Sequence, residues 1–162
     1  MSINFKTERR LTMKRITLLF SGAIVVLFAS MLYATTGPQL EKAIEKGKNL
    51  FMHGTFGGNG KTCETCHTAG GTGPGRIPVG MKFPGLAGGA TFPSLANAAA
   101  IFPRFNPKVN KVITIEDQIR NCTAGALRGK PPAYGSAEMN ALVSYITSLS
   151  QGKPIDMGGK PQ

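Results

Sequence analysis

The sequence predicts a small all-α domain, in which three to four short helices are joined by long loops rich in Gly and Pro that wrap around a ligand. Apolar residues recur at steps of three and four in the N-terminal and C-terminal parts of the chain, as in amphipathic helices. The 162 residues include 21 Gly and 11 Pro but only 7% aromatic residues and no Trp. Side chains alone therefore supply little bulk for a core, and we expect a bound group to complete it.

Residues 1–34 have the features of an export segment. Two basic residues, Lys14 and Arg15, precede the apolar run ITLLFSGAIVVLFA, which leads to Ala34. This pattern is typical of a signal peptide cleaved near Ala34, although the residues just before it are larger than those of a usual cleavage site. An uncleaved membrane anchor over residues 16–34 is the alternative. We expect a periplasmic or exported protein, either soluble or held by this anchor.

The helices are expected in one domain, residues 35–152. They are predicted at residues 39–51, at residues 94–101, from Thr114 to before Gly129, and from Ser136 to before Gly152. Thr114 and Ser136 are typical N-cap residues, and Asp117 lies at the position of a capping-box partner of Thr114. Residues 153–162 are expected to form a flexible C-terminal tail.

The five residues from Cys63 to His67 read Cys-Glu-Thr-Cys-His. In this spacing two thiols can bond the two vinyl groups of one haem while the adjacent His ligates its iron. Two alternatives remain: a zinc site built from Cys63, Cys66, His67 and His53, and a redox pair of the two thiols. The chain has no second Cys pair, and the preceding export segment favours the haem.

The N-terminal helix with Gly47 and Phe51, the Cys63 to His67 motif and the C-terminal helix MNALVSYI resemble class I c-type cytochromes. The resemblance covers nearly all of the chain after the export segment. It implies a cytochrome c fold around one covalent haem c, with the first and last helices crossing at Gly47 and Tyr145. In that family a Pro after the motif commonly holds the proximal His through its carbonyl oxygen, and Pro74 is the candidate here.

The second iron ligand, opposite His67, is not given by the motif. Class I cytochromes usually place a Met in a Met-Pro-Pro segment before the last helix, and here that segment reads Lys130-Pro-Pro. Met81 is the fallback ligand. Cys122 is the strongest alternative because it is the odd cysteine once both thioethers form. It could also be a small buried apolar residue.

The segment IEDQIRNC, which ends at Cys122, together with LRGKP and SAEM further on, gives residues 113–150 a second resemblance. It is to the haem domains of tetrathionate-forming thiosulfate dehydrogenases and of the cysteine-ligated subunit of the Sox sulfur-oxidation system. The resemblance implies that Cys122 is the distal iron ligand and lowers the reduction potential. Arg120 and Lys130 could then attract an anionic sulfur compound. This chain has one CxxCH motif, whereas many such enzymes carry two haems.

Residues 35–162 contain 14 Lys and Arg against 7 Asp and Glu, a net charge of +7. We see no nucleic-acid motif, and the surface suits docking to acidic redox partner proteins, with solubility as an equal alternative. The leading function is an exported monohaem c-type cytochrome that carries single electrons between such partners. The alternative is a thiosulfate-oxidising or thiosulfate-binding haem protein with His/Cys-ligated iron. The sequence favours a non-enzymatic carrier; as an enzyme, the protein would be a thiosulfate dehydrogenase-like oxidoreductase.

Overall fold

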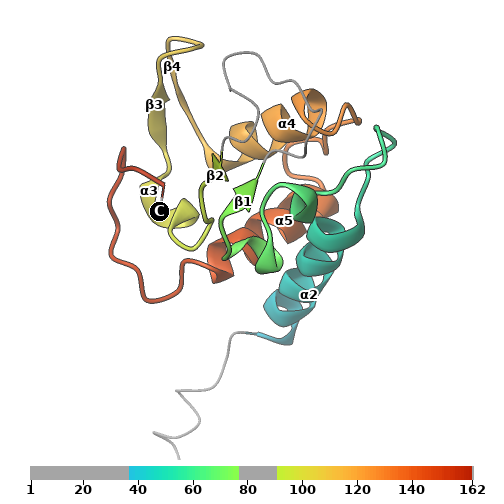
Figure 1. Cartoon of the computed structure of the whole chain (residues 1–162). Helices are drawn as coiled ribbons and strands as arrows, with labels where there is room; N and C mark the ends of the chain where they lie inside the picture. Colours follow the sequence, from blue (N-terminus) through green and yellow to red (C-terminus); the bar gives the residue numbers. More distant parts are fainter. Residues whose placement is uncertain (1–36, 77–90, 162) are drawn as a thin grey trace, which may run out of the picture. The chain divides into compact units, whose positions relative to one another are not determined.

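The computed structural model of the chain describes residues 37–76 and 91–161 (Figure 1). The chain divides into two units, Met1–Pro38 and Gln39–Gln162, and nearly all of the described residues belong to the second. The expected signal peptide or anchor and the fallback ligand Met81 lie outside the described residues. Within the described ranges, no helix is long and apolar enough to cross a membrane.

The described residues form a mostly helical domain with two very small antiparallel sheets. The α-helices are α2 (Pro38–His53), α3 (Ala98–Ile101), α4 (Ile115–Gly125) and α5 (Ala137–Ser148), and two 3-10 turns are η1 (Cys63–Thr65) and η2 (Ala69–Gly71). Strand β1 (Gly75–Arg76) pairs with β2 (Thr91–Phe92), and β3 (Arg104–Asn106) pairs with β4 (Lys111–Ile113). Four helices and long connecting segments confirm the predicted fold class.

Figure 1 shows helices α2 and α5 near each other. Their backbones come into close contact at Gly47. A Cβ atom added at Gly47 would lie 1.9 Å from the carbonyl oxygen of Ala141 and 2.7 Å from the Cβ of Tyr145. No side chain fits in that space, so the approach of the two backbones requires glycine at this position. The crossing at Gly47 and Tyr145 that the sequence predicted is confirmed.

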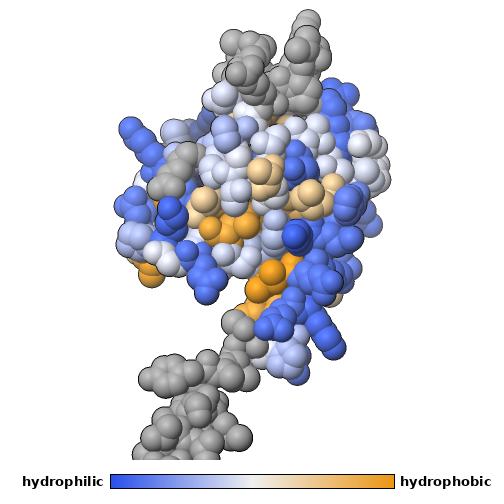
Figure 2. Space-filling model, turned by 60° about the horizontal axis from the view of Figure 1, so that its bottom comes forward, coloured by the Kyte–Doolittle hydropathy of each residue, from blue (hydrophilic) through white to orange (hydrophobic). Residues whose placement is uncertain are grey.

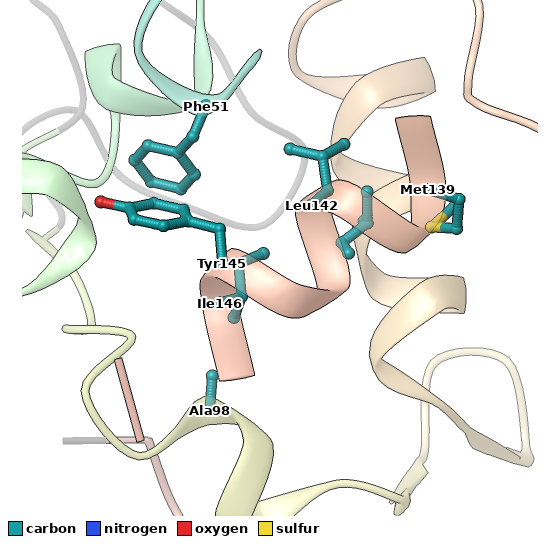
Figure 3. Packing of buried hydrophobic residues seen from close by; sticks show 7 residues of the cluster. Phe51, Ala98, Met139, Leu142, Tyr145 and Ile146 are labelled. Carbon is teal, nitrogen blue, oxygen red and sulfur yellow. The ribbon is translucent and has the colours of Figure 1, made fainter. Parts of the chain in front are cut away.

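The core contains residues of both helices, and Figure 3 shows how its buried side chains pack. The rings of Phe51 on α2 and Tyr145 on α5 pack edge to face, with their centroids 5.4 Å apart. This geometry is favourable for two aromatic rings. The hydroxyl of Tyr145 donates a hydrogen bond to the carbonyl oxygen of Gly70, 2.8 Å away. The core thereby fixes the loop that follows the Cys63 to His67 motif.

Both predicted N-caps are present. The backbone N–H of Asp117 donates to the side chain of Thr114, and the N–H of Thr114 donates back to the Asp117 carboxylate at 2.9 Å, which completes the capping box. The hydroxyl of Ser136 accepts from the N–H of Met139 at 3.1 Å. These bonds satisfy backbone donors that have no partner within the helix. Helix α4 therefore begins where the sequence indicated, although it ends at Gly125, before the predicted end.

Helix α3 is shorter than the predicted helix at residues 94–101. The first of those residues are held by other partners: the N–H of Leu95 donates to the carbonyl oxygen of Gly71 at 2.7 Å. The hydroxyl of Ser94 accepts from the N–H of Ala96 at 3.1 Å, as in a local turn. These bonds compete with a helical first turn, and regular helix begins only at Ala98.

The β3–β4 hairpin was not predicted. Its register pairs Arg104 with Ile113 and Phe105 with Val112. Because side chains alternate between the two faces of a strand, Ile113 is buried on one side of the hairpin, whereas Phe105 and Val112 are 57% and 64% exposed on the other. The turn is stabilised by Asn106, whose side-chain oxygen accepts from the N–H of Lys108 at 3.0 Å.

The segment expected as a flexible tail, residues 153–162, is described as far as Pro161. Although its side chains are mostly exposed, the backbone of this segment is hydrogen-bonded to α3 and its surroundings. The N–H of Asp156 donates to the carbonyl oxygen of Ala100 at 2.8 Å, and the N–H of Gly158 donates to that of Ile101 at 2.9 Å. The side-chain amide of Asn97 donates to the carbonyl oxygen of Lys160 at 3.0 Å. These bonds join groups that are far apart in the sequence, so they could not be predicted from local patterns.

The face drawn in Figure 2 carries mainly hydrophilic side chains, with hydrophobic ones in small, separate patches. This distribution is normal for a protein whose large apolar residues are used in its core. Among the described residues, three of the exposed large apolar side chains belong to the β3–β4 hairpin and its turn: Phe105, Val109 and Val112.

Candidate functional site

The Cys63 to His67 motif forms a tight 3-10 turn that holds its backbone in one conformation. The N–H groups of Cys66 and His67 both donate to the carbonyl oxygen of Cys63, at 3.1 and 2.9 Å. Before the turn, the N–H of Thr62 donates to the hydroxyl of Thr65 at 3.0 Å. The turn brings the two thiols and the imidazole close to one another, as the binding of one group by all three requires.

Strand β1 runs directly against this turn. A Cβ atom added at Gly75 would lie only 1.3 Å from the carbonyl oxygen of Cys66. Because backbone meets backbone here, any side chain at position 75 would push the two segments apart. Glycine at position 75 therefore allows β1 to pack directly against the motif.

The ring of His67 is held by the residues that follow β2. Its Nδ1 lies 3.2 Å from the carbonyl oxygen of Pro93, and its ring packs edge to face against Phe92 with the centroids 5.6 Å apart. Burial lowers the pKa of His67, and the hydrogen bond to Pro93 and the charge of Glu64 oppose that effect. The neutral ring donates one hydrogen bond from Nδ1 and leaves Nε2 as a free electron-pair donor.

The prediction that Pro74 supplies this carbonyl is wrong. The carbonyl oxygen of Pro74 instead accepts a hydrogen bond from the hydroxyl of Thr68 at 3.1 Å. Pro93 supplies this carbonyl oxygen instead. The antiparallel pairing of Gly75 with Phe92 places Pro93, which is distant in sequence, beside His67.

A cavity of about 290 Å³ lies beside the motif. It brings together Cys63, His67 and Cys122, which the sequence marked as cofactor or iron ligands. Cys66 is buried next to them. The cavity walls are mainly apolar: Phe51, Phe92, Pro93, Leu95, Ala98, Ile101, Phe102, Ile115, Ile119, Leu142, Ile146 and Pro161, with the polar residues Ser94, Arg104 and Gln118.

Cys122 reaches the cavity from α4. Its sulfur accepts a hydrogen bond from the side-chain amide of Gln118, at 3.3 Å. Burial raises the pKa of Cys122, and this hydrogen bond opposes the rise. Burial also raises the pKa of Cys63 to about 12, and the nearby Cys122 adds to this effect. The three cysteines form no disulfide, so all of their sulfurs are available to bind another group.

The zinc alternative gains no support from this geometry. It requires Cys63, Cys66, His67 and His53 to converge, but His53 is exposed at the end of α2 and does not line the cavity. In residues 37–76 and 91–161, no group of three or more His, Cys, Asp or Glu side chains is placed to hold a metal ion.

Arg120 and Lys130, the two predicted candidates for attracting an anion, are not among the described residues that line the cavity. The guanidinium of Arg120 donates to the carbonyl oxygen of Pro132 and lies over the ring of Tyr134, 4.5 Å from its centroid. It holds the segment between α4 and α5. The side chain of Lys130 is exposed.

Arg104 and Gln118 are among the cavity residues that the sequence did not mark. The spacing of Gln118 and Cys122 could have shown that they share one face of a helix, because residues four apart are neighbours there. Arg104 had no such signal, because its position depends on the unpredicted β3–β4 hairpin.

Residues 87–155 match the family described as SoxA/TsdA, cytochrome c domain. The chain therefore contains a SoxA/TsdA-type cytochrome c domain. The match includes the whole of residues 113–150, where the sequence predicted this resemblance, and extends it in both directions. It includes Cys122 and Arg104 but begins after the Cys63 to His67 motif.

The cytochrome c domain is distantly homologous to thiosulfate dehydrogenases and to SoxA. It is 32% identical over 99 residues to thiosulfate dehydrogenase from Thiomonas intermedia (strain K12), covering 61% of this chain and 26% of that protein. It is 31% identical over 101 residues to thiosulfate dehydrogenase from Allochromatium vinosum, covering 62% and 33%. The L-cysteine S-thiosulfotransferase subunit SoxA from Rhodovulum sulfidophilum is 28% identical over 101 residues, covering 62% and 28%.

The fold is similar to that of a solved thiosulfate dehydrogenase (TsdBA) from Marichromatium purpuratum. The TM-score is 0.55 at 24% sequence identity, and the similarity covers 78% of this chain and 26% of that chain. The present chain spans about a quarter to a third of the length of the curated relatives that it matches.

A cytochrome c domain carries covalently attached haem c, and the cavity residues fit this group. The donor set is suitable: thiols in the CxxCH spacing lie beside an imidazole whose Nδ1 is already engaged. The walls are apolar, as a porphyrin requires. The Nε atom of Arg104 is buried without a hydrogen-bond partner, which suits a group that also carries carboxylates.

Proposed function

We propose that this chain is a thiosulfate-oxidising or thiosulfate-binding c-type haem protein with one haem, attached through Cys63 and Cys66. In this proposal His67 and Cys122 are the two iron ligands. The observation that carries it is the presence of Cys63, His67 and Cys122 in a single cavity. The family match over the segment that contains Cys122 adds support, because the similar proteins named above are thiosulfate dehydrogenases and SoxA.

This proposal reverses the order of the two functions that the sequence suggested. Composition and a single CxxCH favoured an electron carrier, but homology to thiosulfate dehydrogenases supports sulfur chemistry better. The remaining expectations become parts of the proposal: the domain at residues 35–152, an exported or periplasmic location and redox partner proteins that accept the electrons.

The chain's own residues would each perform a separate task. Cys63 and Cys66 would hold the haem through two thioether bonds. The carbonyl oxygen of Pro93 accepts from Nδ1 of His67, orients the ring and leaves Nε2 for iron. Gln118 donates to the sulfur of Cys122 and orients it toward the cavity. The apolar walls exclude water from the ligands.

Haem supplies a one-electron acceptor when it is bound. Oxidation of two thiosulfate ions to tetrathionate forms one S–S bond and releases two electrons. A protein with one haem must therefore pass the first electron to a partner before it takes the second, or two copies must each take one. This stoichiometry explains why a redox partner is part of the proposal.

Thiosulfate-dependent haem reduction in the purified holoprotein tests the function. We expect added thiosulfate to reduce the haem in the presence of a one-electron acceptor, with tetrathionate as the product, and Cys122→Ala to abolish the reaction. The ferric low-spin spectrum should change in Cys122→Ala and Cys122→Met. Ala124→Ser, an exposed change on the same helix, is the matched control. An unchanged spectrum in both Cys122 variants would rule out thiolate ligation.

A single-electron carrier is the second candidate, and the single CxxCH motif favours it. A carrier predicts fast exchange with small redox reagents and no reduction by thiosulfate, with or without an acceptor. Binding without turnover is a third result: the haem spectrum shifts with thiosulfate but no tetrathionate appears. The same preparation therefore separates the enzyme, the binding protein and the carrier.

A further inference from the structure

Arg104 is the first residue of β3 and contributes to the lining of the haem cavity. Its side chain is half-buried, and its guanidinium carbon lies 5.3 Å from the centroid of the Phe102 ring. The Nε atom is buried and has no hydrogen-bond partner within the described structure. This is a permanently charged group with an unused donor in an apolar space.

The hairpin register aims Arg104 inward. Arg104 pairs with Ile113, which is fully buried, whereas the next pair, Phe105 and Val112, faces solvent. Side chains alternate along a strand, so the same register that exposes Phe105 directs Arg104 to the cavity side. The contact with the Phe102 ring holds the guanidinium there.

An unpaired buried donor on a charged group is costly, and buried donors in folded proteins are nearly always bonded. Among the described residues that line the cavity, Arg104 alone carries a permanent charge, and no Asp or Glu is present. No group in this lining therefore neutralises the positive charge of Arg104. The planar donors of a guanidinium match the two oxygens of a carboxylate or a similar oxyanion.

We propose that Arg104 binds an oxyanion inside the cavity, through Nε–H and a neighbouring Nη–H. Two sources share this chemistry: a propionate carboxylate of the haem, and a free sulfur oxyanion such as thiosulfate. The proposal depends on the haem of the proposed function, but only the second source depends on its thiosulfate chemistry.

The test compares holoproteins carrying Arg104→Gln and Arg104→Lys with the matched control Lys111→Gln. Lys111 lies on the same hairpin and is exposed, so its substitution removes one positive charge outside the cavity. Two quantities are measured: the haem reduction potential without thiosulfate, and the thiosulfate concentration that gives half of the spectral change. Haem content per chain confirms that each variant is loaded.

If the haem carboxylate is bound, Arg104→Gln lowers the reduction potential relative to Lys111→Gln, because loss of a nearby positive charge favours ferric iron. If thiosulfate is bound, the thiosulfate concentration that gives half of the spectral change rises about tenfold in Arg104→Gln, whereas it stays the same if only the haem carboxylate is bound. Arg104→Lys keeps the charge but loses the planar pair of donors, so its change is smaller than that of Arg104→Gln.

The proposal is overturned if both Arg104 variants match Lys111→Gln in both measurements. If Arg104→Gln does not accumulate as a haem-loaded protein, Arg104→Lys against the same control decides the question. The absence of any spectral change when thiosulfate is added to the wild-type protein would contradict the proposed function. The potential measured without thiosulfate would still decide whether Arg104 binds the haem carboxylate, so the two failures are distinguishable.

Discussion

The side-chain amide of Gln118 donates a hydrogen bond to the sulfur of Cys122, 3.3 Å away and one helical turn further along α4. Hydrogen bonds to a ligating sulfur withdraw electron density from it and so tune the reduction potential of the metal. Under the proposed ligation of iron by Cys122, Gln118 is a positioning residue for Cys122, and its effect is separable from ligation itself.

Replacing Gln118 with Leu should lower the haem reduction potential while His/Cys ligation is retained. Loss of a hydrogen bond worth about 1 kcal/mol corresponds to a decrease on the order of 40 mV for one electron. Redox titration gives the potential, and electron paramagnetic resonance of the ferric protein reports the ligands. Asn121→Ala, an exposed change beside Cys122, is the control. Equal potentials for both variants would show that Gln118 does not act on the sulfur.

Gly47→Ala should destabilise the protein by about 3 kcal/mol, because the new Cβ would overlap the backbone of α5 at Ala141. Urea denaturation of the haem-loaded protein measures the change in the free energy of unfolding. Gly125→Ala is the matched control, since nothing lies within 4 Å of a Cβ at that helical position. The control should be neutral or up to about 1 kcal/mol more stable than wild type. Similar results for both substitutions would contradict the tight crossing of α2 and α5.

The helices were predictable because their signals are local. Apolar spacing and the caps Thr114 and Ser136 indicated α4 and α5, and the structure begins both helices at those caps. The β3–β4 hairpin was missed because its strands are only three residues long and contain too few residues to show alternation clearly. Its stability depends on contacts with the rest of the domain.

Asp117→Asn should reduce stability in a pH-dependent way. The hydrogen bond from the N–H of Thr114, followed by that from the Tyr134 hydroxyl, lowers the pKa of Asp117. A carboxyl group with a lower pKa in the folded state stabilises the protein above its unfolded pKa of about 4, and this contribution is lost at lower pH. At pH 7 the variant should therefore be less stable than wild type by at most about 1 kcal/mol, since the site is exposed.

The difference between wild type and Asp117→Asn should shrink as the pH falls below about 4. Urea denaturation at several pH values measures it. Glu116→Gln removes a neighbouring carboxylate in the same turn and leaves the capping box intact, so it should show a smaller loss at pH 7. A difference that is constant with pH would contradict a role for the ionised Asp117 carboxylate.

Arg120→Ala should affect stability rather than thiosulfate binding. Its guanidinium donates to Pro132 and lies over the Tyr134 ring, so we expect the free energy of unfolding to fall by roughly 2 kcal/mol. The thiosulfate concentration for half of the spectral change should stay the same. Lys130→Ala, which removes an exposed charge nearby, is the control for charge alone. A rise in that concentration with Arg120→Ala only would restore the anion-attracting role that the sequence suggested.

The candidate site was predictable where its residues are adjacent in the chain or share a helix, and unpredictable where distant segments meet. The Cys63 to His67 motif and the position of Cys122 on α4 could be recognised by spacing. The partner of His67 could not, because Pro93 reaches it only through the β1–β2 pairing. Arg120 lies two residues from Cys122, yet its side chain points elsewhere, since residues two apart on a helix do not share a face.

The segment after α5 has a practical consequence for protein production. Its backbone is hydrogen-bonded to α3, and Pro161 lines the haem cavity. A foreign affinity tag attached to this segment would therefore lie near the cavity, where it could block a substrate or supply foreign histidines to the iron. A cleavable C-terminal tag that is removed before spectroscopy avoids both artefacts.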